Sequence, residues 1–220
     1  GIDPDDPAAL KPLTREEVIA RHGQGLSLAG KNLAGLDLGG LDLTGADLCK
    51  AKLMKTNLRG CRLDGADLTN ALAGEADFTA ASLRGAKLPR GIFQKAKFIG
   101  ADFTGSDVTK AVMTEADLSR ADLRDALLNK TLFEKALLKE TKLTGAAAGQ
   151  AYFISADAAG ASFAGADLTK AIFQQTTLDG ADFSGATAAK VLFVASGGNT
   201  TTRLQRPSRR QTGLPRFSPS

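Results

Sequence analysis

The chain has 220 residues, a formal net charge of +4, no tryptophan and only 5% aromatic residues. So few aromatic side chains argue against a conventional globular core for a chain of this length. The charge is uneven, because residues 1–23 carry five acidic and three basic side chains, whereas residues 199–220 carry five arginines and no acid. The long segment between them is close to neutral, which argues against nucleic acid as its general partner.

The N-terminal segment divides into a linker and a short helix. Residues 1–12 combine prolines with acidic and small residues, a composition typical of linkers. Thr14 and Glu17 have the spacing of a capping box, and Gly23 is a stop signal. We therefore expect a helix over residues 15–22. Because a helix of two turns is marginal alone in water, we expect it to cap the first end of the segment that follows.

A pattern with a period of five residues fills residues 24–195. An apolar residue falls at every fifth position from 28 to 193, and a small residue, usually Ala, precedes most of these centres by two positions. An α-helix repeats at three and four residues, and a strand at two. A period of five fits a chain that turns a corner after each segment, so that four segments close a square coil and coils stack about 4.8 Å apart. The pattern predicts an all-β solenoid of about 8 coils, with a filled core and no buried active site.

In such a solenoid, residues 20 positions apart stack into columns. One inward column is predicted to form a stack of phenylalanine rings in its second half, at Phe133, Phe153, Phe173 and Phe193. One outward column is glycine, from Gly45 to Gly185, interrupted by Asp125. We interpret the glycine column as a corner that needs positive φ, as in a type II turn.

Two further outward columns are charged. Opposite charges alternate in a column that we interpret as structural: Lys55, Glu75, Lys95, Glu115 and Lys135. The other column is basic and could face an anion: Lys50, Arg90, Lys110, Lys130, Lys170 and Lys190. Asp47, Asp107 and Asp167 lie across the same face and are expected to neutralise part of its charge. We interpret the basic column as a solvated, partly paired face, with an anionic partner as the alternative.

A fourth column breaks the rule of the repeat. The residue before each centre is usually Asp or Asn, but on one face it is bulky and apolar through seven successive coils. An exposed row of this size is typical of an interaction site. We predict a protein interface made of Leu72, Ile92, Val112, Leu132, Tyr152, Ile172, Leu192, Ile154 and Val194. Two-fold self-contact would give a homodimer; cover by the C-terminal tail, or tolerated exposure, are the alternatives.

The C-terminal segment, residues 196–220, has the composition of a basic, disordered tail, which could itself bind nucleic acid or an acidic surface. No signal peptide or transmembrane run is evident. Cys49 and Cys61 indicate no disulfide framework and suit a reducing compartment such as the cytoplasm. The first residue is Gly rather than Met, which suggests a domain cut from a longer chain.

The repeat resembles the consensus A-(D/N)-(L/F)-X-X of the pentapeptide-repeat proteins, as in Ala116-Asp117-Leu118-Ser119-Arg120-Ala121-Asp122-Leu123. The resemblance implies a right-handed quadrilateral β-helix, and roles that include mimicry of DNA to shield gyrase and adaptor or effector-associated modules. The segment from Leu13 to His22, followed by Leu26 to Gly30, is similar to pentapeptide modules tied to bacterial type VI secretion loci. That similarity implies a secretion-associated module, which could belong to a larger, secreted protein.

No combination of residues in the chain indicates catalysis. Metal-ligand spacing, a nucleophile with its base, and a phosphate loop are all missing from the sequence, so we expect neither enzyme activity nor a cofactor. A DNA mimic should be strongly acidic, and the near-neutral body argues against that role. We therefore expect a non-catalytic binding or scaffold module that acts through the apolar column.

Overall fold

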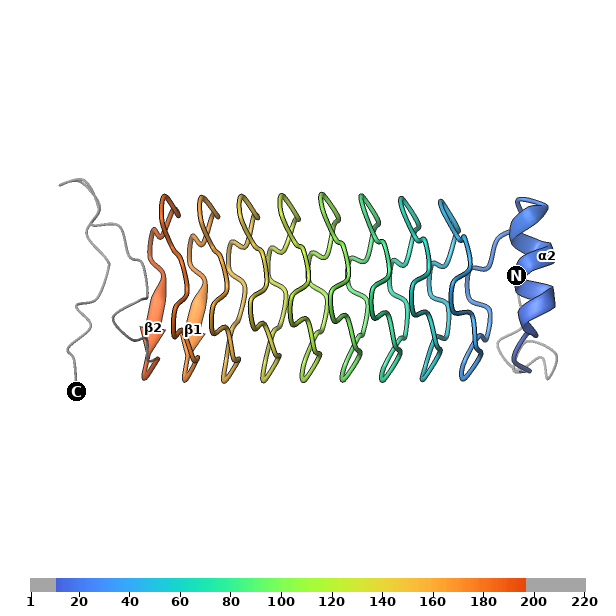
Figure 1. Ribbon diagram of the computed structural model, residues 1–220, viewed down its shortest axis with the longest axis horizontal. Helices are drawn as coiled ribbons and strands as arrows, with labels where there is room; N and C mark the ends of the chain where they lie inside the picture. Colours follow the sequence, from blue (N-terminus) through green and yellow to red (C-terminus); the bar gives the residue numbers. More distant parts are fainter. Residues whose placement is uncertain (1–10, 197–220) are drawn as a thin grey trace.

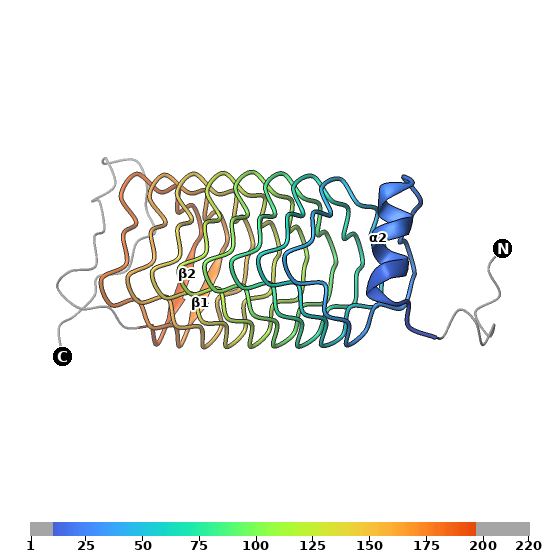
Figure 2. The same ribbon diagram turned by 45° about the vertical axis from the view of Figure 1, so that its right-hand side comes forward.

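The computed structural model describes residues 11–196, which form a single rod of stacked coils (Figure 1). Helix α2 (Arg15–Gly23) lies at one end, and a two-stranded parallel sheet of β1 (Ile172–Gln174) and β2 (Leu192–Val194) lies near the other (Figure 2). Between them, parallel bridges pair residues 20 positions apart, from Asn32 with Lys52 to Asp167 with Thr187. The described chain is therefore a β-solenoid.

The five-residue period follows from a turn that closes every segment. The amide of Ala51, for example, donates to the carbonyl of Leu48 at 3.0 Å, and Lys50 at the turn has φ 57°. The glycine column has the positive φ expected of it, and so does every fifth residue from Gly25 to Ala195, whatever its type. All four corners require it, and a non-glycine residue there costs about 1–2 kcal/mol.

Backbone hydrogen bonds tie each coil to its two neighbours. The amide of Leu48 donates to Asp67 at 2.7 Å, the amide of Lys50 to Thr69 at 2.8 Å, and the amide of Lys52 to Lys31 at 2.9 Å. The same three bonds recur with little interruption along the rod. Because the flanking corners leave few residues on each face, the bridges hold single residues in register rather than long strands.

The core is a continuous column of apolar side chains inside the coils. Every centre from position 28 through position 183 is buried, and so are the small residues two positions before the centres, from Ala46 through Ala181. The Phe153 ring stacks between Phe133 and Phe173, with centroids 5.1 and 4.6 Å apart and planes within 8°. Phe193 continues the stack at 5.1 Å from Phe173, which confirms the predicted phenylalanine column.

Buried polar groups at the small-residue positions bond to the coil before them. Thr131 Oγ1 donates to the carbonyl of Val108 at 2.8 Å, and Thr56 and Thr141 make the equivalent bonds. Cys61 Sγ donates to Leu38 at 3.0 Å, and burial raises the pKa of this thiol. The hydroxyl of Ser106 is buried without a hydrogen-bond partner among the described residues.

Helix α2 lies against the first coil. Thr14 and Glu17 form both hydrogen bonds of the predicted capping box, and the helix agrees with the expected range to one residue. Val18 is fully buried within the core cluster, and Arg15 donates to the backbone carbonyl of Asp37 at 2.7 Å. The positive φ that ends the helix belongs to Gly25 rather than to Gly23.

Two negative findings apply to residues 11–196. No helix in this range is long and apolar enough to cross a membrane, and no group of three or more His, Cys, Asp or Glu side chains could hold a metal ion. The predicted linker up to residue 10 and the predicted basic tail from residue 197 onward lie outside the described residues.

Candidate functional site: an apolar stripe beside a basic ridge

Seven apolar side chains stand in register on one face of the rod. Parallel bridges connect each member to the next, from Leu72 with Ile92 through to Ile172 with Leu192. We call this set the apolar stripe; it consists of Leu72, Ile92, Val112, Leu132, Tyr152, Ile172 and Leu192. Because neighbouring side chains cover one another along the column, the three members at 112, 152 and 172 are half-buried. The other four remain 36–49% exposed.

Other apolar residues are exposed on the stripe face and, separately, on the two adjoining faces. Ile154 and Val194 lie on the same face as predicted, Ile154 half-buried and Val194 exposed. Met54, which sequence reasoning missed, is exposed there too. Leu127 and Leu137 are exposed on the two adjoining faces of the coil that carries Leu132. Comparing the residue before the centre on every face would have found both leucines.

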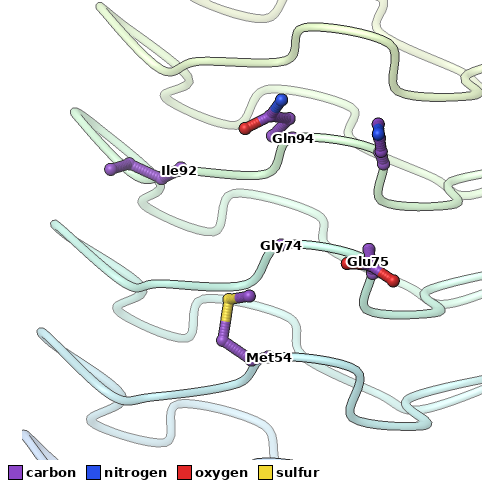
Figure 3. Close-up of a pocket in the computed structure, with 6 residues that line it drawn as sticks. Met54, Gly74, Glu75, Ile92 and Gln94 are labelled. Carbon is purple, nitrogen blue, oxygen red and sulfur yellow. The ribbon is translucent and has the colours of Figure 1, made fainter.

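A depression of about 180 Å³ interrupts the face near the start of the stripe (Figure 3). It exists because Gly74 has no side chain, and Met54 from the preceding coil extends over the glycine. A Cβ on Gly74 would lie 3.0 Å from Met54 Sδ. The residues that line the depression are Met54, Gly74, Glu75, Ile92, Gln94 and Lys95.

The corner beyond this depression carries the column of alternating charge. Lys55 pairs with Glu75 and Lys95 with Glu115, each at 3.7 Å between Nζ and Oε2. Both pairs are largely exposed, so each contributes at most about 1 kcal/mol. This corner is close to neutral and is internally paired.

The opposite corner of the same face is basic and unpaired. We call it the basic ridge: Lys50, Arg90, Lys110, Lys130, Lys170 and Lys190, all of which are exposed. None of these side chains forms an ion pair within residues 11–196, although Arg90 Nε donates to Asn70 at 3.1 Å.

The aspartates that were expected to neutralise part of the ridge form no ion pairs with it. The carboxylates of Asp47, Asp107 and Asp167 accept hydrogen bonds from the backbone amides two residues further on, at 2.9–3.2 Å. An aspartate in this turn is held by its own backbone. These carboxylates therefore accept hydrogen bonds from backbone amides and form no ion pairs with the lysines.

Carboxylates on the remaining two faces pair with nearby cations. Arg62 contacts Asp42 at 2.9 Å, and Lys139 contacts Asp157 at 3.2 Å. Partial burial raises the pKa of Asp122, but hydrogen bonds from the side chain and backbone of Arg124 outweigh it and hold that pKa below its ordinary value. Several carboxylates on these faces are therefore paired with cations, whereas the residues of the basic ridge are not.

These features define a β-solenoid whose chemistry lies on an outer face rather than in an enclosed site. The family model for pentapeptide repeats matches eight copies, over residues 32–70, 76–114, 116–148 and 149–185. The chain belongs to the pentapeptide-repeat family, whose members form right-handed quadrilateral β-helices and are generally non-catalytic.

One solved structure supports the same fold. HetL from the cyanobacterium Nostoc sp. strain PCC 7120, a pentapeptide-repeat protein involved in the regulation of heterocyst differentiation, is 25% identical. The match covers 86% of this chain and 98% of HetL, with a TM-score of 0.53. A thylakoid-lumen pentapeptide-repeat protein from Arabidopsis thaliana is 33% identical over 42% of this chain and 64% of its own, with a TM-score of 0.41.

QnrB1, a plasmid-mediated fluoroquinolone resistance protein, is 19% identical over 75% of this chain and 90% of its own, with a TM-score of 0.47. Neither of the last two similarities carries a functional argument. No curated protein matches the sequence. The comparisons give no support to the predicted link with type VI secretion.

Proposed function

We propose that the protein is a non-catalytic binding module that holds another polypeptide, or a second copy of itself, against the apolar stripe. One observation carries the proposal: seven successive rungs place a bulky apolar side chain where the repeat otherwise favours Asp or Asn. Six steps of about 4.8 Å make the stripe roughly 29 Å long. A row of that length is in the range that marks interaction sites.

The rod suits a scaffold role because its shape is set by the backbone. Its coils, about eight by the sequence pattern, are joined rung by rung through backbone hydrogen bonds. In this proposal helix α2 acts as a cap, since Val18 covers the apolar end of the core and Arg15 occupies carbonyls of the first coil. The face thus presents a preformed surface that needs little ordering on binding.

The DNA-mimic alternative is not favoured by the charges. A mimic needs an unpaired acidic face, whereas several carboxylates on the two faces away from the stripe and ridge pair with arginine or lysine.

The test compares wild type with the double variant Ile92→Asp/Leu132→Asp by size-exclusion chromatography with light scattering, and by quantitative mass spectrometry of co-purified proteins. Leu127→Asp/Leu137→Asp is the matched control, because it places the same charges on exposed positions of neighbouring faces. We expect the stripe variant to lose the self-association or the partner that wild type and control retain. A monomeric wild type whose partners bind all three proteins equally would contradict the proposal.

A further inference from the structure

The apolar stripe and the basic ridge are parallel and adjacent along the rod. Five of the six ridge residues precede a stripe residue by two positions, as in Arg90 before Ile92 and Lys110 before Val112. Two extended residues span about 6–7 Å, so a partner that covers the stripe also meets the ridge. Six coils, from Arg90 to Lys190, have a stripe residue two positions after the corner. The corner residue is lysine in four of these coils, arginine in one and Gln150 in one.

The residues of the basic ridge have an unfavourable backbone conformation and repel one another. Its six residues all have positive φ, between 56° and 62°, a conformation that glycine adopts without strain. The neighbouring glycine column shows that this chain uses glycine at another corner of the same coils. Like charges about 5 Å apart also repel one another. The alternating corner has the same positive φ, but its opposite charges form ion pairs. The ridge combines the strain with repulsion and has no such pairs, which favours a role in a contact.

Self-association through this face meets an electrostatic obstacle. When two copies pack face to face about a two-fold axis perpendicular to the rod, the ridge of one lies against the ridge of the other. When the axis runs along the rod, each ridge meets the alternating corner of Lys55, Glu75 and Lys95, whose charges are already paired. In neither arrangement does the second copy place unpaired carboxylates opposite the six exposed cations of the ridge.

A second feature sets the position of a partner along the rod. The rungs repeat every 4.8 Å or so, so a partner on a uniform stripe could slide by one coil at little cost. Gly74 is the one glycine that directly follows a centre on this face between residues 34 and 194, and the depression beside it, about 180 Å³ in volume, suits one large apolar side chain (Figure 3). Buried apolar anchors of this kind dominate binding at many interfaces.

We infer that the partner is a separate polypeptide segment, apolar along one side and acidic along the adjacent edge, which inserts one bulky apolar side chain into the depression at Gly74. The inference rests on the proposed function and names the chemistry of its partner. A helix that covers the roughly 29 Å stripe needs about 19 residues. Its carboxylates would lie against the ridge, where charge pairing adds specificity and speeds association.

The probe is a phage-displayed library of random peptides of about 20 residues, selected on immobilised wild-type protein. We expect the selected peptides to combine apolar residues at helical spacing with an excess of Asp and Glu. Affinities of three enriched peptides are then measured by calorimetry on wild type and variants.

Two pairs of variants separate the features. Lys110→Asn/Lys130→Asn removes ridge charge with a residue that already occupies this corner at position 70, and Arg120→Asn/Lys135→Asn removes the same charge at two other corners. Gly74→Leu fills the depression, and Gly39→Leu makes the same change at the equivalent position of another face. We expect the ridge variant and Gly74→Leu each to weaken binding on the order of tenfold, with the two controls near wild type.

The outcomes distinguish this inference from the function on which it rests. Peptides that need Ile92 and Leu132 but show no acidic preference and bind the ridge variant normally would overturn the inference and leave the proposed function standing. Peptides that bind Ile92→Asp/Leu132→Asp as tightly as wild type would overturn both. Failure to select peptides, with ridge-dependent binding to phosphatidylserine vesicles instead, would also overturn the inference, because the surface would then be a membrane contact.

Discussion

Ile92 pairs with Val112 in a parallel bridge, so the two side chains leave the same face of the rod one coil apart. The pairing continues from rung to rung, which turns a one-dimensional repeat into a surface with distinct faces. Stability and binding are therefore separable in this molecule, because inward positions hold the core and outward positions hold the chemistry.

The corner geometry predicts opposite effects for two neighbouring substitutions. Lys110 and Gly105 both have positive φ, 60° and 67°. Lys110→Gly should raise the free energy of unfolding by up to about 1 kcal/mol, and Gly105→Ala should lower it by a similar amount. Urea denaturation midpoints followed by circular dichroism measure both, and a fall for Lys110→Gly would contradict the strain assigned to the corners.

The phenylalanine stack predicts a large effect at its centre. Phe153 is fully buried between two rings, so Phe153→Ala should cost about 3–5 kcal/mol through lost contacts and a cavity. Ile92→Ala, at a position 42% exposed, should cost about 1 kcal/mol or less. Thermal denaturation of the two variants side by side is the measurement; similar losses would place Ile92 in the core rather than on the surface.

Two buried hydroxyls should respond in opposite ways. Ser106 has no hydrogen-bond partner among the described residues, and alanine is the usual residue at its position, so Ser106→Ala should stabilise the protein by about 1 kcal/mol. Thr131→Val removes the bond to Val108 and should destabilise it by a similar amount. If chemical denaturation shows Ser106→Ala to be clearly destabilising, the hydroxyl has a partner after all.

The lowered pKa of Asp122 predicts a dependence on pH. A carboxyl whose pKa is lower in the folded chain than in the unfolded chain stabilises the fold above its unfolded value of about 4. That stability is lost as pH falls through the lower, folded value. The difference in melting temperature between wild type and Asp122→Asn should be present at pH 7 and should disappear at acid pH; a difference that grows on acidification would contradict the direction.

The cysteines should differ in reactivity. Cys61 is fully buried, and burial raises the pKa of its thiol, whereas Cys49 is only half-buried. Native protein treated with dithionitrobenzoate should therefore show one fast-reacting thiol, which the variant Cys49→Ser lacks, and a second only on unfolding. Two equally fast thiols in the native protein would show that Cys61 is exposed.

Much of the fold follows from the sequence because the period of five admits few other structures. Leu48 and its equivalents face inward, and Ala46 and its equivalents fill the space beside them. The apolar stripe could also be identified from the sequence alone. The positive φ at Lys50 was not evident, because the closure of the coil imposes it rather than the residue type.

Two parts of the candidate site could not have been predicted. The depression at Gly74 depends on how Met54 extends over the glycine from the coil before it. The unpaired state of the ridge depends on Asp107 and its equivalents bonding to backbone amides instead of to the lysines. Both are choices between side-chain arrangements of similar energy, which spacing alone does not decide.

The most direct test of the central proposal is photo-crosslinking in the native host, with benzoylphenylalanine placed at position 132 or at position 142. Leu132 lies on the apolar stripe, and Lys142 precedes its centre in the same way on another face. Crosslinking of a polypeptide from position 132 and not from position 142 is the predicted result. Equal crosslinking from both positions, or crosslinking from position 142 alone, would show that the apolar stripe is not the binding surface.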